Sequence, residues 1–420
     1  MPVTDAPPAD RIVQLVDTLE DELRAIRRQI HANPELGWME QETTALIADR
    51  LTAAGLRPRL LPTSGLVCDI GPDPRGVRRR RIALRGDLDA LPVQERTGLP
   101  YASTKPGVSH ACGHDVHATT VLGAGLALAQ LDAEGLLPVG ARLIFQPAEE
   151  IQPSGGRELV DSGVLEGVEQ VFALHCAPQI EVGKVGSRIG PITAASDNVT
   201  VTVSSGGGHT SRPHLTGDVV YALGHLITQL PAVLGRRIDP RSGTNLTWGA
   251  VHAGKATNTI PATGTVSGTL RSLDIAAWDR AAGLVDGLVR DLLAPFGVDV
   301  ELKHERGMPP VHNDELSVRT LDGAVREVVG PEAVVLTEQS LGGEDFAWYL
   351  ARIPGAMVRL GTRAPGGPAF DLHQGDLVID ERAIAAGAKL LARTVQVAAY
   401  QQSSPSRRDR GAGRGPGAPH

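Results

Sequence analysis

Short apolar stretches that run into acidic or imidazole side chains constrain the fold of this chain most. Residues 82–84 precede Asp87 and Asp89, 143–145 precede Glu149 and Glu150, 171–174 end at His175, and 356–360 lead into the segment that holds His373. Helical stretches alternate with these strands, which is typical of an α/β fold with a mostly parallel sheet. Because ligands of such sheets bind outside the carboxyl ends of the strands, we expect these side chains to gather in one site.

The middle of the chain has a different pattern. Strands are expected at 198–204, 244–251, 264–270 and 298–302, and helices at 218–234 and 275–293. The order β-α-β-β-α-β is that of a ferredoxin-like domain. We therefore predict an α/β domain formed by 10–190 and 306–402, interrupted by an inserted domain at 191–305. The ends, 1–9 and 403–420, have little to bury and are expected to be disordered.

Composition excludes several classes of protein. The net charge of −7 over 420 residues gives no reason to expect a nucleic-acid partner. Three cysteines cannot build a disulfide framework and fit a reducing compartment. Neither a signal peptide nor a membrane span is visible in the sequence. The sequence therefore predicts a cytoplasmic protein that does not bind membranes.

Residues 110–117, His-Ala-Cys-Gly-His-Asp-Val-His, offer four potential metal ligands within eight residues. Thiolate and imidazole bind borderline divalent cations strongly. No second Cys/His pair completes a zinc-ribbon spacing, and the other candidate ligands are scattered along the chain. We interpret this segment as part of a catalytic metal site. His110 and His117 are expected to support the ligands, and Cys176 to be a packed thiol.

The adjacent carboxylates Glu149 and Glu150 are the second strong signal. Neighbouring side chains diverge on an extended backbone, so one carboxylate can bind a metal while the other serves as a general base. A solvated loop pair is the alternative. His175 is interpreted as a ligand because it ends an apolar strand, whereas spacing alone does not decide the role of His373.

A glycine-rich loop, residues 206–214, follows the first strand of the inserted domain and contains His209 and His214. The Gly-Lys-Ser/Thr ending of a phosphate loop is absent. Its imidazoles can donate to a developing oxyanion. Asn258 and Arg271 are candidates for binding a substrate carboxylate, although a surface role is favoured for each in isolation.

Together these motifs resemble the aminoacylase / carboxypeptidase G family of dinuclear metallopeptidases. The match is best to its amidohydrolase branch of hippurate hydrolases, N-acyl-amino-acid amidohydrolases and indole-acetyl-amino-acid hydrolases. The matching segments are 31–37, 86–92, 110–117, 146–150, His175, 209–214, 258–261, 343–346 and His373. They extend over nearly the whole chain between its two ends.

The resemblance implies that the α/β domain is catalytic, that the inserted domain is a lid that also dimerises, and that each subunit binds two divalent metal ions. The mixed thiolate, imidazole and carboxylate ligands suit Zn(II) or Mn(II) first and Co(II) or Ni(II) next. The resemblance also implies the ligand set Cys112, His114, Glu150, His175 and His373, with Cys112 bridging. Glu149 would then be the general base, and His209 a lid histidine that reaches the active site of a partner subunit in a homodimer. Asn258 and Arg271 would recognise the substrate carboxylate. Peptidase branches have a metal-binding His where this chain has Asp87, so we expect Asp87 and Asp89 to support the ligands without binding metal.

The function predicted from these residues is hydrolysis of an N-acyl amino acid to a carboxylate and a free amino acid. Two alternatives stay open. A dipeptidase or exopeptidase would use the same scaffold, although the Cys112/His114 pair argues against it. An inactive, metal-bound dimeric binding protein would have no use for a base beside the ligand Glu150.

Overall fold

The described residues, 9–71 and 81–403 of the computed structural model, form two units. The first contains the residues up to Ile189, Asn313–Thr337 and those from Arg352 onward, and the second contains Gly190–His312 and Glu338–Ala351. Residues 338–351, expected in the catalytic domain, belong to the second unit. Backbone hydrogen bonds explain this, because Ser340 N–H donates to Ile192 O and Ala194 N–H donates to Gly342 O.

The two ends expected to be disordered lie outside the described residues, apart from one residue of each. Ala9 is the first residue of α1 and Ser403 is the last residue of α9. Ile12, Val16, Leu23, Ile26 and Ile30 are buried along α1. These positions give the helix one continuous apolar face.

An eight-stranded sheet of order β1-β2-β4-β3-β5-β16-β6-β15 forms the centre of the first unit. Its strands are β1 (Arg59–Leu60), β2 (Leu66–Ile70), β3 (Arg81–Asp87), β4 (Ala141–Gln146), β5 (Val168–Glu181), β6 (Val185–Ser187), β15 (Val334–Leu336) and β16 (Gly355–Arg363). The four central strands β4, β3, β5 and β16 are mutually parallel. The predicted fold class, a mostly parallel sheet, is therefore confirmed, and the carboxyl ends of these four strands meet at one edge.

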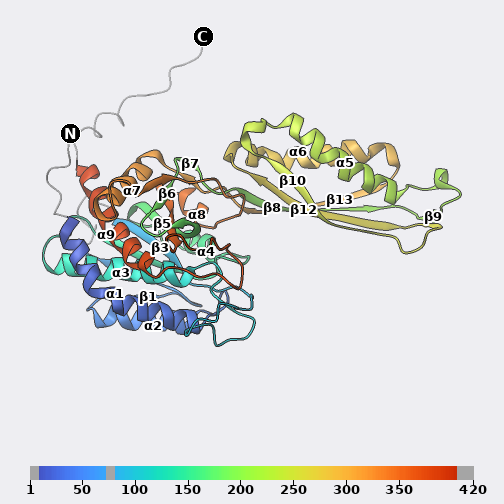
Figure 1. Ribbon diagram of the computed structural model, residues 1–420. Coiled ribbons are helices and arrows are strands. Elements are labelled where there is room, and N and C mark those ends of the chain that lie inside the picture. Colours follow the sequence, from blue (N-terminus) through green and yellow to red (C-terminus); the bar gives the residue numbers. More distant parts are fainter. Residues whose placement is uncertain (1–8, 72–80, 404–420) are drawn as a thin grey trace, which may run out of the picture. The chain divides into compact units, whose positions relative to one another are not determined.

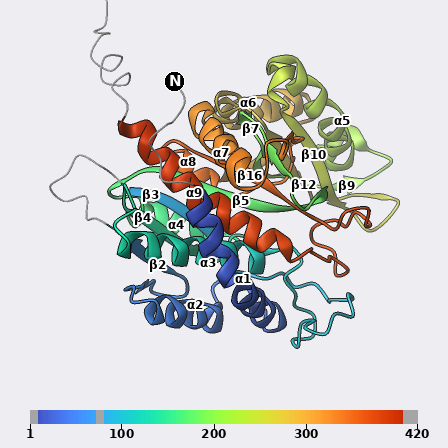
Figure 2. The ribbon, with the colours of Figure 1, turned by 60° about the vertical axis from the view of Figure 1, so that its left-hand side comes forward.

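The helices of the first unit are α1 (Ala9–Ala32), α2 (Gln41–Ala53), α3 (His114–Ala133), α4 (Gly155–Asp161), α7 (Glu315–Val328) and α9 (Arg382–Ser403). Helices α1, α3 and α9 pack side by side, and α3 also contacts β3, β4 and β5 (Figures 1 and 2). Small residues permit this close approach: a Cβ on Gly123 would lie 2.6 Å from Leu23, and one on Gly125 would lie 2.2 Å from Leu143. Helix α3 is thus fixed at the centre of the unit.

Strand β5 differs from its prediction. It does not end at His175 but continues to Glu181, because the residues after His175 keep pairing with β16, with Cys176 opposite Leu360 and Ala177 opposite Gly361. His175 therefore lies inside a paired strand.

The second unit contains an antiparallel sheet of order β10-β12-β8-β13. Its main elements are β8 (Ala195–Ser204), α5 (Val219–Arg237), β10 (Asn245–Ala253), β12 (Thr263–Ser272), α6 (Ile275–Leu293) and β13 (Asp299–Met308). Shorter elements are β7 (Gly190–Pro191), β9 (Gly208–His209), β11 (Thr259–Ile260) and α8 (Ala347–Leu350), and β14 (His312–Asn313) spans the boundary between the units. Helices α5 and α6 pack together on one face of the sheet (Figure 1). The predicted order β-α-β-β-α-β is confirmed.

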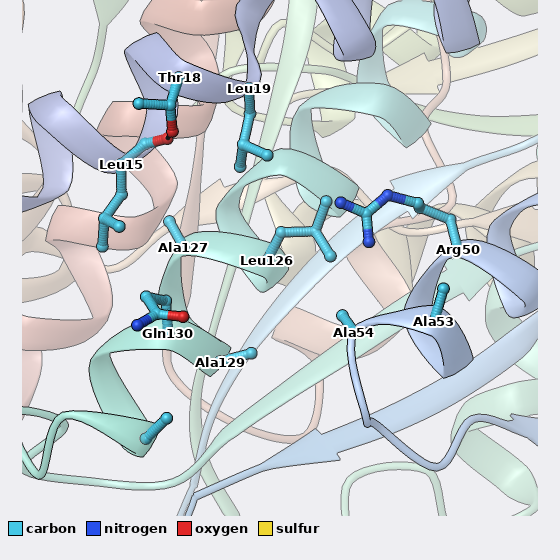
Figure 3. A pocket seen from close by; sticks show the side chains of 11 residues that line it. Leu15, Thr18, Leu19, Arg50, Ala53, Ala54, Leu126, Ala127, Ala129 and Gln130 are labelled. Atoms are coloured by element: carbon cyan, nitrogen blue, oxygen red, sulfur yellow. Dashed lines mark hydrogen bonds between the residues drawn. The ribbon is translucent and has the colours of Figure 1, made fainter.

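Two further features bear on function. No helix in the described part of the chain is long and apolar enough to cross a membrane. A hollow of about 400 Å³ lies among α1, α2 and α3 and is lined mainly by Leu and Ala side chains (Figure 3). Because its lining contains no Cys, His, Asp or Glu, this hollow is not a metal site.

Candidate metal centre

The five side chains predicted as metal ligands lie together in the first unit. Their ligand atoms form two overlapping groups, Cys112–His114–His175 and Cys112–Glu150–His373, and within each group all atoms lie within 4.8 Å of one another. Cys112 is common to both groups, which is the geometry that a bridging thiolate requires. Glu149 lies in a further group with His114 and Glu150, so the expected base is next to the expected ligands.

The distances between these atoms suit coordination of a shared ion. Cys112 Sγ lies 3.6 Å from His175 Nε2, and Glu150 Oε1 lies 3.2 Å from His373 Nε2 and 3.8 Å from His114 Nε2. A thiolate and an imidazole bound to one tetrahedral zinc ion would be separated by about 3.6 Å. His114 Nε2 and Glu150 Oε1 are also buried without a hydrogen-bond partner. The donor set therefore fits two divalent ions.

Hydrogen bonds fix which nitrogen of each buried ligand is available. His114 Nδ1 lies 3.1 Å from Asp89 Oδ1, and His175 Nδ1 donates to the carbonyl of Cys176 at 2.8 Å. Each imidazole thus carries its proton on Nδ1 and presents the lone pair of Nε2 to the centre. This arrangement is typical of metal-binding histidines.

Asp89 and Asp87, expected to support the ligands, each contact more than one group. Asp89 receives hydrogen bonds from His114 Nδ1 and, at 2.9 Å, from the backbone N–H of Glu150. Asp87 lies 2.6 Å from both Arg85 Nη1 and His117 Nδ1. His117 Nε2 in turn accepts the backbone N–H of Cys176 at 2.8 Å. Both ring nitrogens of His117 are therefore used. Nδ1 contacts Asp87, and Nε2 holds the backbone of β5 at the residue after His175.

Two backbone conformations shape the ligand loops. Gly113, between Cys112 and His114, has a φ of 86°, and a Cβ there would lie 2.9 Å from Cys176 Sγ. Glycine is the residue that adopts this left-handed turn without strain. His373 also has a positive φ, 61°, and its N–H donates to Ala111 O at 2.8 Å. That bond connects the loop of His373 to the loop of Cys112.

A buried charge network behind the Cys112 loop was not predicted from the sequence. Asp115 Oδ2 lies 2.7 Å from Arg27 Nε and 2.7 Å from His31 Nδ1, and all three side chains are buried. Glu95 contacts the other ring nitrogen of His31 at 3.3 Å. The only signal in the sequence was the one-turn spacing of Arg27 and His31 before the end of the first helix. The network fixes the first turn of α3, which begins at His114.

Burial and neighbouring charges set the protonation of the ligands before metal binds. Burial raises the pKa of the Cys112 thiol well above its usual value. Burial also acts to lower the pKa of His114, but Asp87 and Asp89 raise that pKa well above the ordinary value. The pKa of His175 is lowered well below its usual value by burial and by Arg359. Since a metal must displace protons from Cys112 and His114, metal affinity is expected to rise with pH.

The candidate substrate residues His209, Asn258 and Arg271 all lie in the second unit. Thr259 and Ile260 pair with His209 and Gly208, and Thr210 N–H donates to Asn258 O, so His209 and Asn258 are neighbours. Arg271 lies near the other end of β12, eight residues beyond Thr263, which corresponds to about 26 Å. The length of β12 therefore separates Arg271 from the end of the sheet at which His209 and Asn258 lie.

Comparison with known proteins agrees with this geometry. The chain belongs to the peptidase family M20/M25/M40, whose model matches residues 83–397. In fold it is similar to the Bacillus subtilis YXEP protein, a dinuclear metal-binding peptidase of the M20 family (TM-score 0.79, 30% identity, 91% of this chain and 99% of that chain covered). It is also similar to a putative aminohydrolase from methicillin-resistant Staphylococcus aureus (TM-score 0.86, 28% identity, 92% and 98% covered).

Several related proteins are named for an activity. An N-acetyl-L-cysteine deacetylase of Bacillus subtilis is 37% identical over 88% of this chain and 86% of its own length. A putative glutamate–cysteine ligase of Rhodococcus jostii is 48% identical over 89% of this chain, but the chain covers only 46% of that protein. The family, a hydrolase with divalent metals, is thus confirmed, whereas the hippurate hydrolase branch stays a prediction.

Replacing Cys112 by Ser is expected to lower metal occupancy and activity together, because a hydroxyl is a much poorer bridging ligand than a thiolate at neutral pH. Elemental analysis of the purified variant measures this. Cys176→Ser is the matched control, since Cys176 is an equally buried thiol outside the ligand groups. Full occupancy in Cys112→Ser would remove Cys112 from the ligand set.

Arg27→Met is expected to lower the free energy of unfolding by about 3 kcal/mol, because the buried charge of Asp115 would lose Arg27 and keep only the contact with His31. Metal affinity is expected to fall by about 10-fold or more as the loop loses its support. Arg28→Met on the same helix removes an exposed ion pair with Glu381 and is the control, with an expected cost below about 1 kcal/mol. Equal effects of the two substitutions in denaturant unfolding and metal titration would contradict this role.

Proposed function

We propose that this protein hydrolyses the amide bond of N-acyl amino acids and releases a carboxylate and a free amino acid. The observation that carries this proposal is the pair of overlapping ligand groups with Glu149 beside them. Bound divalent ions, Zn(II) or Mn(II) before Co(II) or Ni(II), would supply Lewis-acid polarisation of the scissile carbonyl. The ligands are Cys112, His114, Glu150, His175 and His373. We further propose that the protein works in the cytoplasm.

Glu149 is the general base in this proposal. It accepts a proton from the attacking water and delivers it to the departing amine. Its neighbour Glu150 is tied through its N–H to Asp89, which fixes the backbone that carries both carboxylates. The preceding Ala148 is held in the same way, because its N–H donates to the buried Glu40 at 2.8 Å. The loop is therefore anchored on both sides of the base.

His209 is the proposed donor to the oxygen that becomes negatively charged in the transition state. The backbone N–H of Ser211 donates to His209 Nδ1 at 3.0 Å. A backbone N–H can only donate, so Nδ1 holds a lone pair and the proton of the neutral ring is on Nε2. This tautomer presents an N–H donor, which is what stabilisation of an oxyanion needs.

The distance between Asn258 and Arg271 favours a homodimer in which each active site uses residues of two subunits. The edges of the second unit's sheet suggest which strand pairs across the two-fold axis. Strand β13 exposes Asp299, Glu301 and Lys303, a pattern that opposes pairing. Strand β10 carries no charged residue, and its Val251 is 53% exposed. We propose that β10 forms the dimer contact.

The names of two relatives suggest which N-acyl amino acid should be tested first. Bacillus subtilis proteins named N-acetyl-L-cysteine deacetylase and N-acetylcysteine deacetylase are 37% and 34% identical to this chain. N-acyl-cysteine is therefore the first candidate substrate. A relative named Thermostable carboxypeptidase 2, from Saccharolobus solfataricus, is 34% identical over 89% of this chain, which keeps an exopeptidase as the second candidate.

An assay of amine release from N-acetyl- and N-benzoyl-amino acids, with dipeptides in parallel, tests the proposed function. N-acyl amino acids are expected to be the better substrates by kcat/KM. Glu149→Gln should keep its metals and its fold while turnover falls by about 100-fold or more, the range for losing a general base. Faster turnover of dipeptides would favour the exopeptidase. A lack of turnover of any of these amides by the metal-loaded protein would favour a binding protein.

Mixing inactive His209→Ala subunits with inactive Glu149→Gln subunits is expected to restore activity. If His209 acts on its partner's centre, each heterodimer has one site with both residues intact and one with neither, so the activity per heterodimer approaches half of the wild-type value. An oxyanion donor contributes about 100- to 1000-fold to turnover, so the activity of the mixture would clearly exceed that of either variant alone.

Subunit exchange in this mixture is measured by pull-down of differently tagged chains. Adding Val251→Lys to both chains is the control, because a charge on the proposed edge should prevent dimers and abolish the gain. Heterodimers that form without any gain in activity would mean that His209 does not act across the interface.

A further inference from the structure

Three non-glycine residues of the described chain have a positive φ: Trp38 (67°), Ala148 (51°) and His373 (61°). Two of them belong to the metal centre, since Ala148 precedes Glu149 and His373 contacts Glu150. Bulky residues rarely adopt this conformation, and such strain is held mainly at functional sites. The metal centre does not explain the positive φ of Trp38.

Trp38 is attached to the loop that carries the two glutamates. Its indole Nε1 donates to Pro153 O at 3.1 Å. A Cβ on the preceding Gly37 would lie 2.9 Å from Ile151 Cδ1 and 3.2 Å from Ala148 Cα. The segment of Trp38 therefore lies directly against residues 148–153, on both sides of Glu149 and Glu150.

The contact leaves apolar groups open to solvent beside a centre of buried charges. Ile151, next in sequence to Glu150, is 42% exposed, Met39 is 60% exposed, and Trp38 is partly exposed. We call these three side chains the Trp38–Ile151 surface. Small-molecule sites combine such apolar lining with a few fixed polar groups, and this surface adjoins the fixed polar groups of the metal centre.

We propose that the Trp38–Ile151 surface binds the acyl group of the substrate and favours bulky apolar acyl groups, such as benzoyl, over acetyl. This inference rests on the proposed function. The residues proposed for the amino acid's carboxylate belong to the second unit, so the acyl group is the part of the substrate left for an apolar surface beside Glu149. The indole offers a flat face to an aromatic acyl group, and Ile151 offers a branched apolar edge.

The ratio of kcat/KM for N-benzoyl- to N-acetyl-cysteine tests this specificity. In Ile151→Ala the ratio is expected to fall by about 10-fold, since apolar contacts of this size change specificity by that order. Ile151→Leu should keep most of the ratio. Leu336→Ala is the control and should leave the ratio unchanged. Leu336 is an exposed leucine on the edge strand β15, at the opposite edge of the sheet from β1. Metal content and thermal unfolding are measured for every variant.

A ratio in Ile151→Ala within two-fold of the wild type, at full metal content, would overturn this inference and leave the proposed function intact. A wild-type protein that cleaves neither substrate would overturn both. The two failures are therefore distinguishable.

Tryptophan fluorescence gives a second measurement that does not need turnover. Benzoate, the acid released from the N-benzoyl substrate, is expected to change the emission of the metal-loaded wild type more than acetate does. Trp38→Phe should lose that difference, whereas Phe at Trp248, Trp278 or Trp348 should keep it. An unchanged benzoate response in Trp38→Phe would mean that the ring does not bind at Trp38.

Discussion

The carboxylate of Asp89 connects two parts of the metal centre that are far apart in sequence. One oxygen receives His114 Nδ1 from the start of α3, and the other receives the N–H of Glu150 from the loop after β4. The first bond selects the tautomer of His114, and the second fixes the backbone of both glutamates. The rest of the site depends on this bridge, because Cys112 and Glu149 are each within two residues of its end points.

Helix α3 is packed in the core of the first unit, and its first residue, His114, belongs to the metal centre. Gly123 and Gly125 let the helix approach α1 and β4, and the ion pair of Asp115 with Arg27 locks its first turn. Left-handed Gly113 then directs Cys112 and His114 to one centre. A charge pair in the interior gives little net stability compared with apolar packing, but it defines position strongly. Here it lies directly behind a ligand, where position matters most.

The structure brings together the candidate ligands with the clearest local signals in the sequence. Cys112-Gly113-His114 and Glu149-Glu150 are short motifs at ends of elements, and the parallel strands bring such ends together. The sequence did not predict the partners of Asp115, which come from a separate helix, nor the continuation of β5 beyond His175, which depends on pairing with β16. Asn258 and Arg271 were paired by their chemistry and by the resemblance, without regard to the strand between Thr263 and Arg271.

The candidate metal ligands and the side chains proposed to bind the acyl group differ in their burial. The ligands Cys112, His114 and His175 are buried and tied to partners, so a substitution among them disturbs several hydrogen bonds at once. Ile151 and Met39 are exposed, and exposed apolar side chains can change at little cost in stability. Two relatives, each 34% identical to this chain, are named for a deacetylase in one case and for a carboxypeptidase in the other.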